Sequence, residues 1–254
     1  MKLATWNVNS LKVRLPHVLQ WLADNPVDVL CLQETKLTDD KFPVTDIEKA
    51  GYQVIFSGQK TYNGVAILSK HPMSEVVKNN PRFEDEQQRI IAATIEGMRV
   101  VCAYFPNGQS VGSDKYLYKL KWIEALHDWL AAELGAHESL ALLGDYNIAP
   151  EDRDVHDPAA WKDQVLCSEA ERAEFQRLVA LGLKDAYRLF EQPEKIFSWW
   201  DYRMMAFRRN MGLRIDHILL SAPLASRCSA CVIDKAPRKL EQPSDHAPVV
   251  ATID

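Results

Sequence analysis

A carboxylate and a carboxamide, Asp145 and Asn147, directly follow the apolar segment 140–144. Such an apolar run is typical of a buried strand. Side chains two residues apart on an extended chain point the same way, so this acid and this amide would project together from the end of a core strand. Both residue types also favour turns, and the pair taken alone is as typical of a turn closed by Pro150 as of a functional site.

The same layout, an apolar segment that ends in polar side chains, recurs along the chain. In sheet proteins, ligands bind near the ends of strands, beyond their hydrogen-bonded middle. Carboxylates that converge on one point repel each other unless they are protonated or held by a cation. The candidate residues found in this way are Asn7, Asn9, Glu34, Tyr104, Asn107, Asp145, Asn147, Asp216, Asp245 and His246.

These candidates predict a site for a hard divalent cation. Oxygen ligands without cysteine and with few histidines favour Mg²⁺ or Mn²⁺ over zinc. A hard cation that keeps open coordination positions suits a phosphate substrate. Asp216 and His246 would supply a second part of the site, in which the carboxylate orients the imidazole.

The elements that must position these groups begin with a strand, a helix and a strand, expected at 3–8, 14–25 and 27–32. Apolar residues repeat at helical spacing between Leu15 and Leu22, and Pro16 is expected in the first helical turn, where proline is tolerated. The elements expected next are a short helix at 46–50 and strands at 52–56, 65–68, 75–78, 89–95 and 99–103, the last two joined by a hairpin at 96–98.

The second half of the chain also mixes helices and strands. Ser168 and Glu171 form a capping-box pattern for a helix that runs to about Leu181. The longest helix is expected at 116–134, with an apolar stripe of Leu117, Leu120, Ile123, Leu126, Leu130 and Leu134. Loops are expected at 152–164 and 204–212, and strands at 197–202, 213–220, 228–233 and 249–253.

The composition is that of an ordinary globular protein, with 254 residues, 47% hydrophobic and 26% charged. Because no linker or low-complexity segment interrupts the chain, we expect one α/β domain over residues 1–254, with two packed sheets and outer helices. A net charge of −5 argues against a chain coated in basic residues, but it is compatible with a local basic face that binds nucleic acid.

We expect a cytoplasmic protein, because no signal peptide or membrane-spanning segment is visible and the five cysteines fit a reducing compartment. Cys31 and Cys102 lie in apolar strands and are expected to be small core residues. Cys228 and Cys231 form a lone C-x-x-C, and a zinc site would need a second pair of ligands nearby.

Nine short motifs run in order from one end of the chain to the other: WNVNSL at 6–11, LQETK at 32–36, YNGVA at 62–66, QRII at 88–91, YFPNG at 104–108, GDYNIAP at 144–150, FSWWDYR at 197–203, GLRID at 212–216 and SDHAP at 244–248. Together they resemble the exonuclease III/AP endonuclease family, within the deoxyribonuclease I-like endonuclease/exonuclease/phosphatase superfamily. The resemblance implies a four-layer α/β sandwich and a metal-dependent phosphodiesterase that acts on DNA.

By this resemblance the cofactor would be Mg²⁺, as one or two ions, with Mn²⁺ as a substitute. Glu34 would be the central metal ligand. The other residues in or beside the metal site would be Asn7, Asp145, Asn147, Asp245 and His246.

The resemblance also implies the catalytic roles. Asp145 would be the general base that activates the attacking water, and Asn147 would help to place that water and the phosphate. His246, paired with Asp216, would contact the scissile phosphate and support its transition-state charge, although some accounts of the family make this histidine the base. Tyr104 and Asn107 would hold the phosphate.

Trp199, Leu213 and Ile215 would line a pocket for an extruded abasic sugar. An abasic nucleotide unstacks easily, and a tight apolar pocket would exclude a normal nucleotide. Strand alternation predicts that Trp200 points into the core and that His217 points away from the site. The residues expected to contact phosphates or DNA are Asn9, Lys36, Arg89, Asn107, Arg203, Arg208 and Arg209.

The expected partner is double-stranded DNA with abasic sites or damaged 3′ ends, bound by a monomer in the bacterial cytoplasm. Two alternatives stay open: a weakly catalytic nucleic-acid-binding regulator, and a phosphoesterase of the same superfamily with a non-DNA substrate. The presence of Glu34, Asp145, Asp216 and His246 argues against the first, and Trp199 argues against the second. The sequence leaves open whether abasic-site cleavage, 3′-end trimming or removal of 3′ phosphates dominates.

Overall fold

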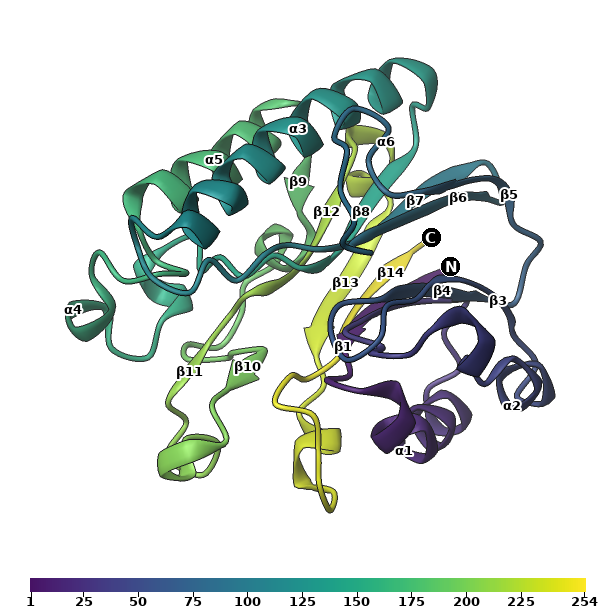
Figure 1. The fold of residues 1–254 in the computed structure, drawn as a ribbon, viewed down its shortest axis with the longest axis horizontal. Coiled ribbons are helices and arrows are strands. Elements are labelled where there is room, and N and C mark those ends of the chain that lie inside the picture. The colour runs from purple at the N-terminus through teal and green to yellow at the C-terminus, as the bar shows by residue number, and fades with distance from the viewer.

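The computed structural model describes residues 1–254, and it contains two mixed six-stranded sheets. We call the sheet that holds both chain termini sheet A (Figure 1). Its strands, in spatial order, are β13 (Cys228–Ile233), β14 (Val249–Ile253), β1 (Lys2–Asn7), β2 (Val29–Gln33), β4 (Val65–Ser69) and β3 (Gln53–Ser57).

The other sheet, sheet B, is built mainly from the middle of the chain. Its strands, in spatial order, are β5 (Ser74–Lys78), β6 (Ile90–Ile95), β7 (Met98–Tyr104), β8 (Leu140–Asp145), β12 (Asp216–Leu220) and β9 (Lys184–Asp185). A separate two-stranded ribbon, β10 (Trp199–Trp200) with β11 (Gly212–Leu213), extends beyond the sheets (Figure 1).

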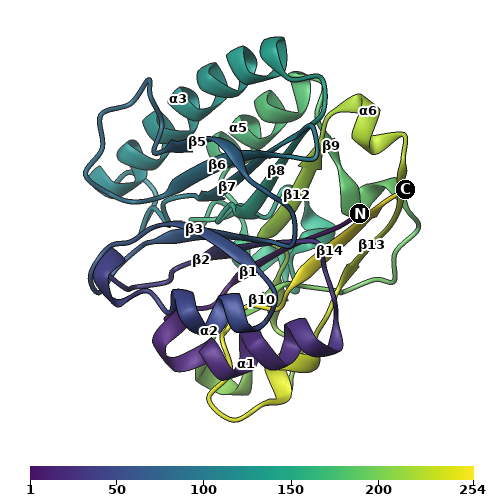
Figure 2. The same ribbon diagram turned by 90° about the vertical axis from the view of Figure 1, so that its right-hand side faces the viewer.

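Helices cover the outer faces of both sheets, so the molecule has four layers (Figure 2). The long helices α3 (Asp114–Ala136) and α5 (Glu169–Ala180) lie over sheet B, while α1 (Leu11–Asp24) and α2 (Val44–Lys49) lie over sheet A. The short helices are α4 (Pro158–Trp161), α6 (Ala222–Ala225) and the 3₁₀ turns η1 (Asp39–Lys41), η2 (Asp152–Asp154), η3 (Ala186–Leu189), η4 (Arg203–Met205) and η5 (Ala236–Lys239).

Three apolar cores separate these four layers. The largest lies between the sheets and joins residues such as Val29 and Cys31 of sheet A to Val100 and Cys102 of sheet B. A second core packs sheet B against α3 and α5, and a third packs sheet A against α1 and α2. The fold expected from the sequence, a four-layer α/β sandwich with two packed sheets, is therefore confirmed.

Several local predictions are confirmed in detail. The hairpin between β6 and β7 has Glu96 and Gly97 at its tip, both with positive φ (48° and 77°), as a two-residue turn of right-handed twisted strands requires. Ser168 caps α5 in a capping box with Glu171. Cys31 and Cys102 are buried core residues.

Other local predictions are wrong, and tertiary contacts explain why. Helix α1 starts at Leu11 rather than at residue 14, because the backbone N–H groups of Ser10 and Leu11 donate to carbonyls at the end of β2. Pro16 therefore lies in the second turn instead of the first. Leu117, assigned to the apolar stripe of α3, is 51% exposed. The polar residue Lys119 is buried on that helix instead.

The last third of the chain is less regular than expected. The predicted strand at 213–220 is interrupted between β11 and β12, and only Trp199 and Trp200 of the predicted strand at 197–202 pair as a strand. The expected loop at 152–164 contains η2 and α4. A strand of two residues has too few positions for an alternation of buried and exposed side chains to be recognised in the sequence, so such strands are hard to predict. No helix of the structure is both long and apolar enough to cross a membrane.

Gly144 is a position at which the fold tolerates no side chain. A Cβ atom there would lie 1.8 Å from the carbonyl oxygen of Ala103, its partner on the neighbouring strand β7. Gly144→Ala should therefore push β7 and β8 apart and lower the free energy of unfolding by about 1–3 kcal/mol, as overpacked cores do. Urea unfolding followed by circular dichroism measures this.

Gly135 provides the matched control for that substitution. It lies near the end of α3, and no atom comes within 4 Å of a Cβ built there. Gly135→Ala should leave stability unchanged or raise it by up to about 1 kcal/mol, since alanine favours helix over glycine. Equal stability of Gly144→Ala and the wild type would contradict the packing argument.

Candidate active site

Strand register places three of the candidate side chains in one row across sheet B. Tyr104 is the last residue of β7, Asp145 the last of β8, and Asp216 the first of the antiparallel strand β12. Asp145 pairs in register with Tyr104 on one side and with Asp216 on the other. Because these strand ends are adjacent, two carboxylates and a phenol lie together where the strands of sheet B end.

Sheet A contributes the residues on the other side of the site. Asn7 ends β1, and Glu34 follows β2, which runs parallel to β1. Glu34 has a positive φ of 52°, Asn147 one of 50° and Asn9 one of 42°. Left-handed backbone at non-glycine residues costs free energy and gathers at functional sites, where surrounding contacts hold it in place.

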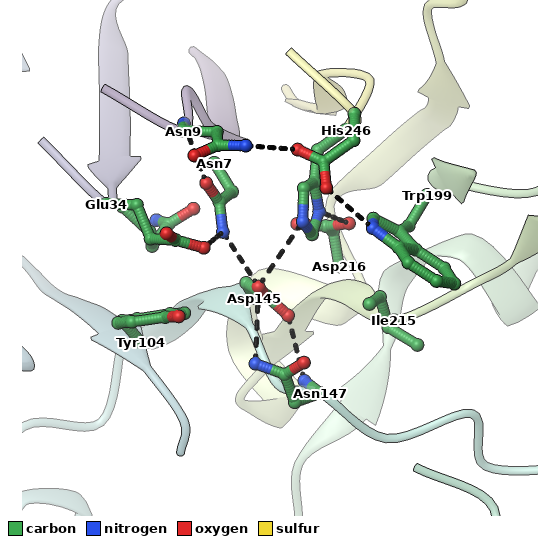
Figure 3. A network of polar contacts seen from close by, with 12 residues as sticks. Asn7, Asn9, Glu34, Tyr104, Asp145, Asn147, Trp199, Ile215, Asp216 and His246 are labelled. Carbon is green, nitrogen blue, oxygen red and sulfur yellow. Dashed lines mark hydrogen bonds and ion pairs between the residues drawn. The ribbon is translucent and has the colours of Figure 1, made fainter. Parts of the chain in front are cut away.

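A network of hydrogen bonds joins these residues (Figure 3). The Asn7 amide donates to Glu34 Oε1 at 2.8 Å and to Asp145 Oδ2 at 2.9 Å. The backbone N–H of Asn147 donates to Asp145 Oδ1 at 2.9 Å. Asn7 therefore bridges a carboxylate that follows a strand of sheet A and one that ends a strand of sheet B.

His246 stands between the two aspartates of sheet B. Its Nδ1 lies 2.8 Å from Asp216 Oδ2, and its Nε2 lies 3.7 Å from Asp145 Oδ2. Burial by itself would lower the pKa of His246, but the two carboxylates outweigh burial and raise that pKa to about 10. In this arrangement the imidazole donates from Nδ1 to Asp216, which fixes its orientation, and Nε2 faces Asp145 at ion-pair distance.

The donor set fits a hard divalent cation. Ligand atoms from Glu34, Asp145 and His246 all lie within 4.8 Å of one another. Burial raises the pKa of the Asp145 carboxyl, His246 opposes this rise, and Asp216 adds to it. Carboxylate oxygens are the ligands that Mg²⁺ and Mn²⁺ prefer, and a bound cation would add positive charge beside them.

The remaining expected ligands surround this cluster without joining it. Asn7 presents its N–H₂ group, not its oxygen, to the carboxylates, because its Oδ1 accepts from the backbone of Asn9. Asn147 Oδ1 accepts from Asn107 at 3.2 Å. Asp245 accepts from Asn9 at 3.1 Å and from the Trp199 indole at 2.9 Å.

Two loops after β7 and β8 hold the expected phosphate-binding groups. Besides its bond with Asn107, Asn147 donates to the carbonyl of Phe105 at 3.0 Å. Arg89 stacks on the Tyr104 ring, with its guanidinium 4.7 Å from the ring centre, and donates to the Tyr104 carbonyl. A cation over the ring face fixes the direction in which the phenol points.

An apolar surface lies on the opposite side of the site from Tyr104 (Figure 3). Trp199 is partly exposed there and packs on a small cluster that includes the buried Leu213 and Ile215. The bond from the Trp199 indole to Asp245 ties this apolar surface to the polar part of the site. The structure thus brings the three residues of the expected sugar pocket together beside the carboxylates.

Besides Arg89 and Asn107, described above, the expected DNA-contact residues fall into two groups. Lys36 and Asn9 lie at the site itself, where the Lys36 ammonium is 2.9 Å from Glu34 and 2.5 Å from the Asn9 side chain. The exposed Arg203, Arg208 and Arg209 lie on the loop between β10 and β11, which projects from the body of the molecule (Figure 1).

Sequence reasoning missed two positioning hydroxyls. Ser198 Oγ accepts from the backbone N–H groups of Ile215 and Asp216, both at 3.0 Å, and so holds the start of β12. Ser244 Oγ donates to the Asn7 carbonyl at 2.7 Å and accepts from the backbone of His246 at 3.2 Å. Both serines stand inside the family-like motifs, but only their contacts reveal what they do.

The expected orientations of the neighbours Trp200 and His217 are confirmed. Trp200 is fully buried in the cluster beneath the ribbon. His217 points away from the carboxylates and contacts Arg214 and the carbonyl of Ile148.

Comparison with known proteins agrees with this geometry. Residues 4–246 match the Endonuclease/Exonuclease/phosphatase family. Exodeoxyribonuclease III of Haemophilus influenzae is 39% identical over 99% of this chain and 99% of its own length. The chain therefore belongs to this family.

Solved structures of relatives have the same fold over the whole chain. A 3′ phosphatase, NExo, from Neisseria, bound to product DNA hairpin, has a TM-score of 0.98 and 47% identity, covering 100% of this chain and 99% of that one. An AP endonuclease from Archaeoglobus fulgidus has a TM-score of 0.96 and 41% identity, with the same coverage. The family resemblance inferred from the motifs is thus confirmed.

The contact between Asp216 and His246 gives a test of the electrostatics. Asp216→Asn removes the nearest negative charge, so the pKa of His246 should fall by about 1–3 units. NMR titration of the imidazole, with chelator present, measures this. Asp24→Asn, an exposed change on α1, is the control and should leave that pKa unchanged. An unaltered His246 pKa in Asp216→Asn would show that Asp216 does not orient a charged imidazole.

Proposed function

We propose that this protein is a metal-dependent DNA-repair phosphodiesterase of the exonuclease III type. It cleaves on the 5′ side of abasic sites in duplex DNA, removes nucleotides or blocking groups from 3′ ends, or does both. The observation that carries the proposal is the meeting of Glu34, Asp145 and the Asp216–His246 pair at one point, beside the apolar surface of Trp199. Its relatives are nucleases, which supports the same conclusion.

The proposed cofactor is Mg²⁺, with Mn²⁺ as a substitute. Glu34 and Asp145 would hold it, and Asn7 would orient both carboxylates toward it. When bound, the ion neutralises charge on the phosphate oxygens and increases the acidity of bound water. Although its ring nitrogen lies within 4.8 Å of the ligand atoms of Glu34 and Asp145, His246 in this proposal binds the phosphate as an imidazolium and not the metal, because a protonated imidazole has no lone pair for a metal.

The attacking group in this proposal is a water molecule placed by Asp145 and Asn147. The oxygen of the water forms a bond to phosphorus, and its proton passes to Asp145 as the general base. The bond from phosphorus to the 3′ oxygen breaks, and that oxygen takes a proton from solvent water and leaves as a hydroxyl. His246, Tyr104 and Asn107 stabilise the charge on the phosphate oxygens.

The substrate in this proposal is double-stranded DNA bound by a monomer. A sugar without a base would fit against Trp199, Leu213 and Ile215, because an abasic nucleotide leaves the stack at low cost. Lys36, Arg89 and the three arginines near β10 and β11 would contact phosphates, so that binding weakens as salt rises. Acting on bacterial chromosomal DNA, the protein would work in the cytoplasm.

Three labelled duplexes test the proposal: one with an internal abasic site, one with a recessed 3′ hydroxyl and one with a 3′ phosphate. We expect cleavage with Mg²⁺ and none with chelator. The relative rates identify the dominant activity. If no duplex is cleaved while binding persists, the protein is a regulator and the proposed function is wrong. Hydrolysis of soluble phosphoinositides instead of DNA would also overturn it.

Two variants separate the roles of the carboxylates. Asp145→Asn should lower turnover by roughly 10²–10⁴-fold, the usual contribution of a general base, while DNA binding persists. Glu34→Gln should weaken Mn²⁺ binding measured by electron paramagnetic resonance. Glu48→Gln, an exposed change on α2, is the control for both measurements. Unchanged Mn²⁺ affinity in Glu34→Gln would refute its role as a ligand.

A further inference from the structure

Lys119 is a charged residue on the buried face of α3, with an exposed fraction of 0%. Its ammonium group has three N–H bonds and three acceptors. It donates to the carbonyl of Asn147 at 2.7 Å, to the carbonyl of Asn107 at 3.2 Å, and to the carboxylate of Glu171. Every donor of the buried cation is therefore used, which is the condition for burying a charge at tolerable cost.

The two carbonyls belong to the loops that carry the phosphate-binding amides. The side chains of Asn107 and Asn147 bond to each other at 3.2 Å. Lys119 bonds to the backbone of both residues, so one ammonium group links the two loops in addition to the bond between the two amides. Asn147 also has a left-handed backbone, which needs such outside support.

Glu171 extends the same arrangement toward the apolar side of the site. Its carboxylate accepts from the backbone N–H of Leu166 at 3.0 Å and of Ser168 at 3.2 Å, and from the Ser168 hydroxyl at 2.6 Å. The carbonyl of Leu166 accepts from Ala149 at 2.8 Å. Leu166 and Ala149 both pack in the cluster that contains Leu213 and Ile215. One buried ion pair therefore connects the phosphate side of the site to its apolar side.

Global stability alone does not account for this pair. Buried ion pairs contribute little stability compared with apolar residues of the same volume, because removing two charges from water offsets their attraction. The geometric effect is different, because one amine bonds to three separate chain segments at once. A displacement of about 1 Å in such groups can slow a reaction about 10²-fold.

We propose that Lys119 is a positioning residue of the active site, acting with Glu171 to fix the amides of Asn107 and Asn147 against the phosphate. This inference rests on the proposed function. Lys119 touches neither substrate nor metal in this proposal and acts only through the two loops. Its loss should therefore slow the chemical step more than it weakens DNA binding.

Lys119→Met tests the proposal, because methionine keeps most of the volume and removes the charge and the donors. The matched control is Arg99→Met, which removes another buried cation, one on β7 that is 2% exposed and 2.5 Å from Glu133 of α3. Arg99 lies on β7 near its first residue, Met98, at the opposite end of that strand from Tyr104. Both variants are compared at a temperature where circular dichroism shows that they are folded.

We expect kcat of Lys119→Met to fall about 10–100-fold, with KM for DNA within about threefold of the wild type. Arg99→Met should keep the wild-type kcat, and Lys119→Arg, which keeps a charge and donors, should recover part of the rate. In metal-free protein, the side-chain amide signals of Asn107 and Asn147 in ¹⁵N NMR spectra should shift or broaden in Lys119→Met and not in Arg99→Met.

Equal kcat values for the two methionine variants, or a loss confined to KM, would overturn the proposal. If Lys119→Met does not fold, Glu171→Gln tests the same arrangement, since it removes the counter-charge of Lys119; an unchanged kcat and unchanged amide signals there would also overturn it. If the wild type cleaves no duplex, the proposed function fails. The amide signals would then still show whether Lys119 holds the two loops.

Discussion

The structure of this site depends on carboxylates that meet where water is nearly excluded. Asp145 and Asp216 are 1% exposed, lie opposite each other in register, and have raised pKa values because burial disfavours their charged forms. The fold compensates with the amide of Asn7, the backbone N–H of Asn147 and the imidazole of His246, which donate to these carboxylates or lie beside them. A divalent cation would supply further positive charge beside these carboxylates.

Two stacked sheets suit this arrangement because the site lies where strand ends from both sheets come together. Parallel strands β1 and β2 deliver Asn7 and Glu34 from one sheet, and β7 and β8 deliver Tyr104 and Asp145 from the other. The apolar core between the sheets fixes the register of each strand, since a slip by one residue would turn its buried side chains toward the wrong face. Packing far from the site thus sets distances inside it.

The surroundings of the carboxylates differ on their two sides. On one side, Arg89, Tyr104 and the amides held by Lys119 form a polar wall whose parts are bonded to one another. On the other side, Trp199 covers an apolar cluster and is tied to the polar centre through Asp245. In the proposed function, a DNA strand crossing the site would meet the proposed phosphate-binding groups on one side and the proposed sugar pocket on the other.

The sequence by itself determined the parts that depend on local pattern. Apolar segments that end near Asp145 or Glu34 predicted core strands and site residues. The order of the motifs along the chain indicated the family. Only tertiary structure decided the early start of α1, the interruption between β11 and β12, and the roles of Ser198, Ser244 and Lys119. Each of those depends on partners tens of residues away in the chain, and a buried lysine such as Lys119 looks like a surface residue until its three acceptors are in place. Periodicity records which face of an element is apolar, but it does not record which distant backbone atoms a polar side chain will meet.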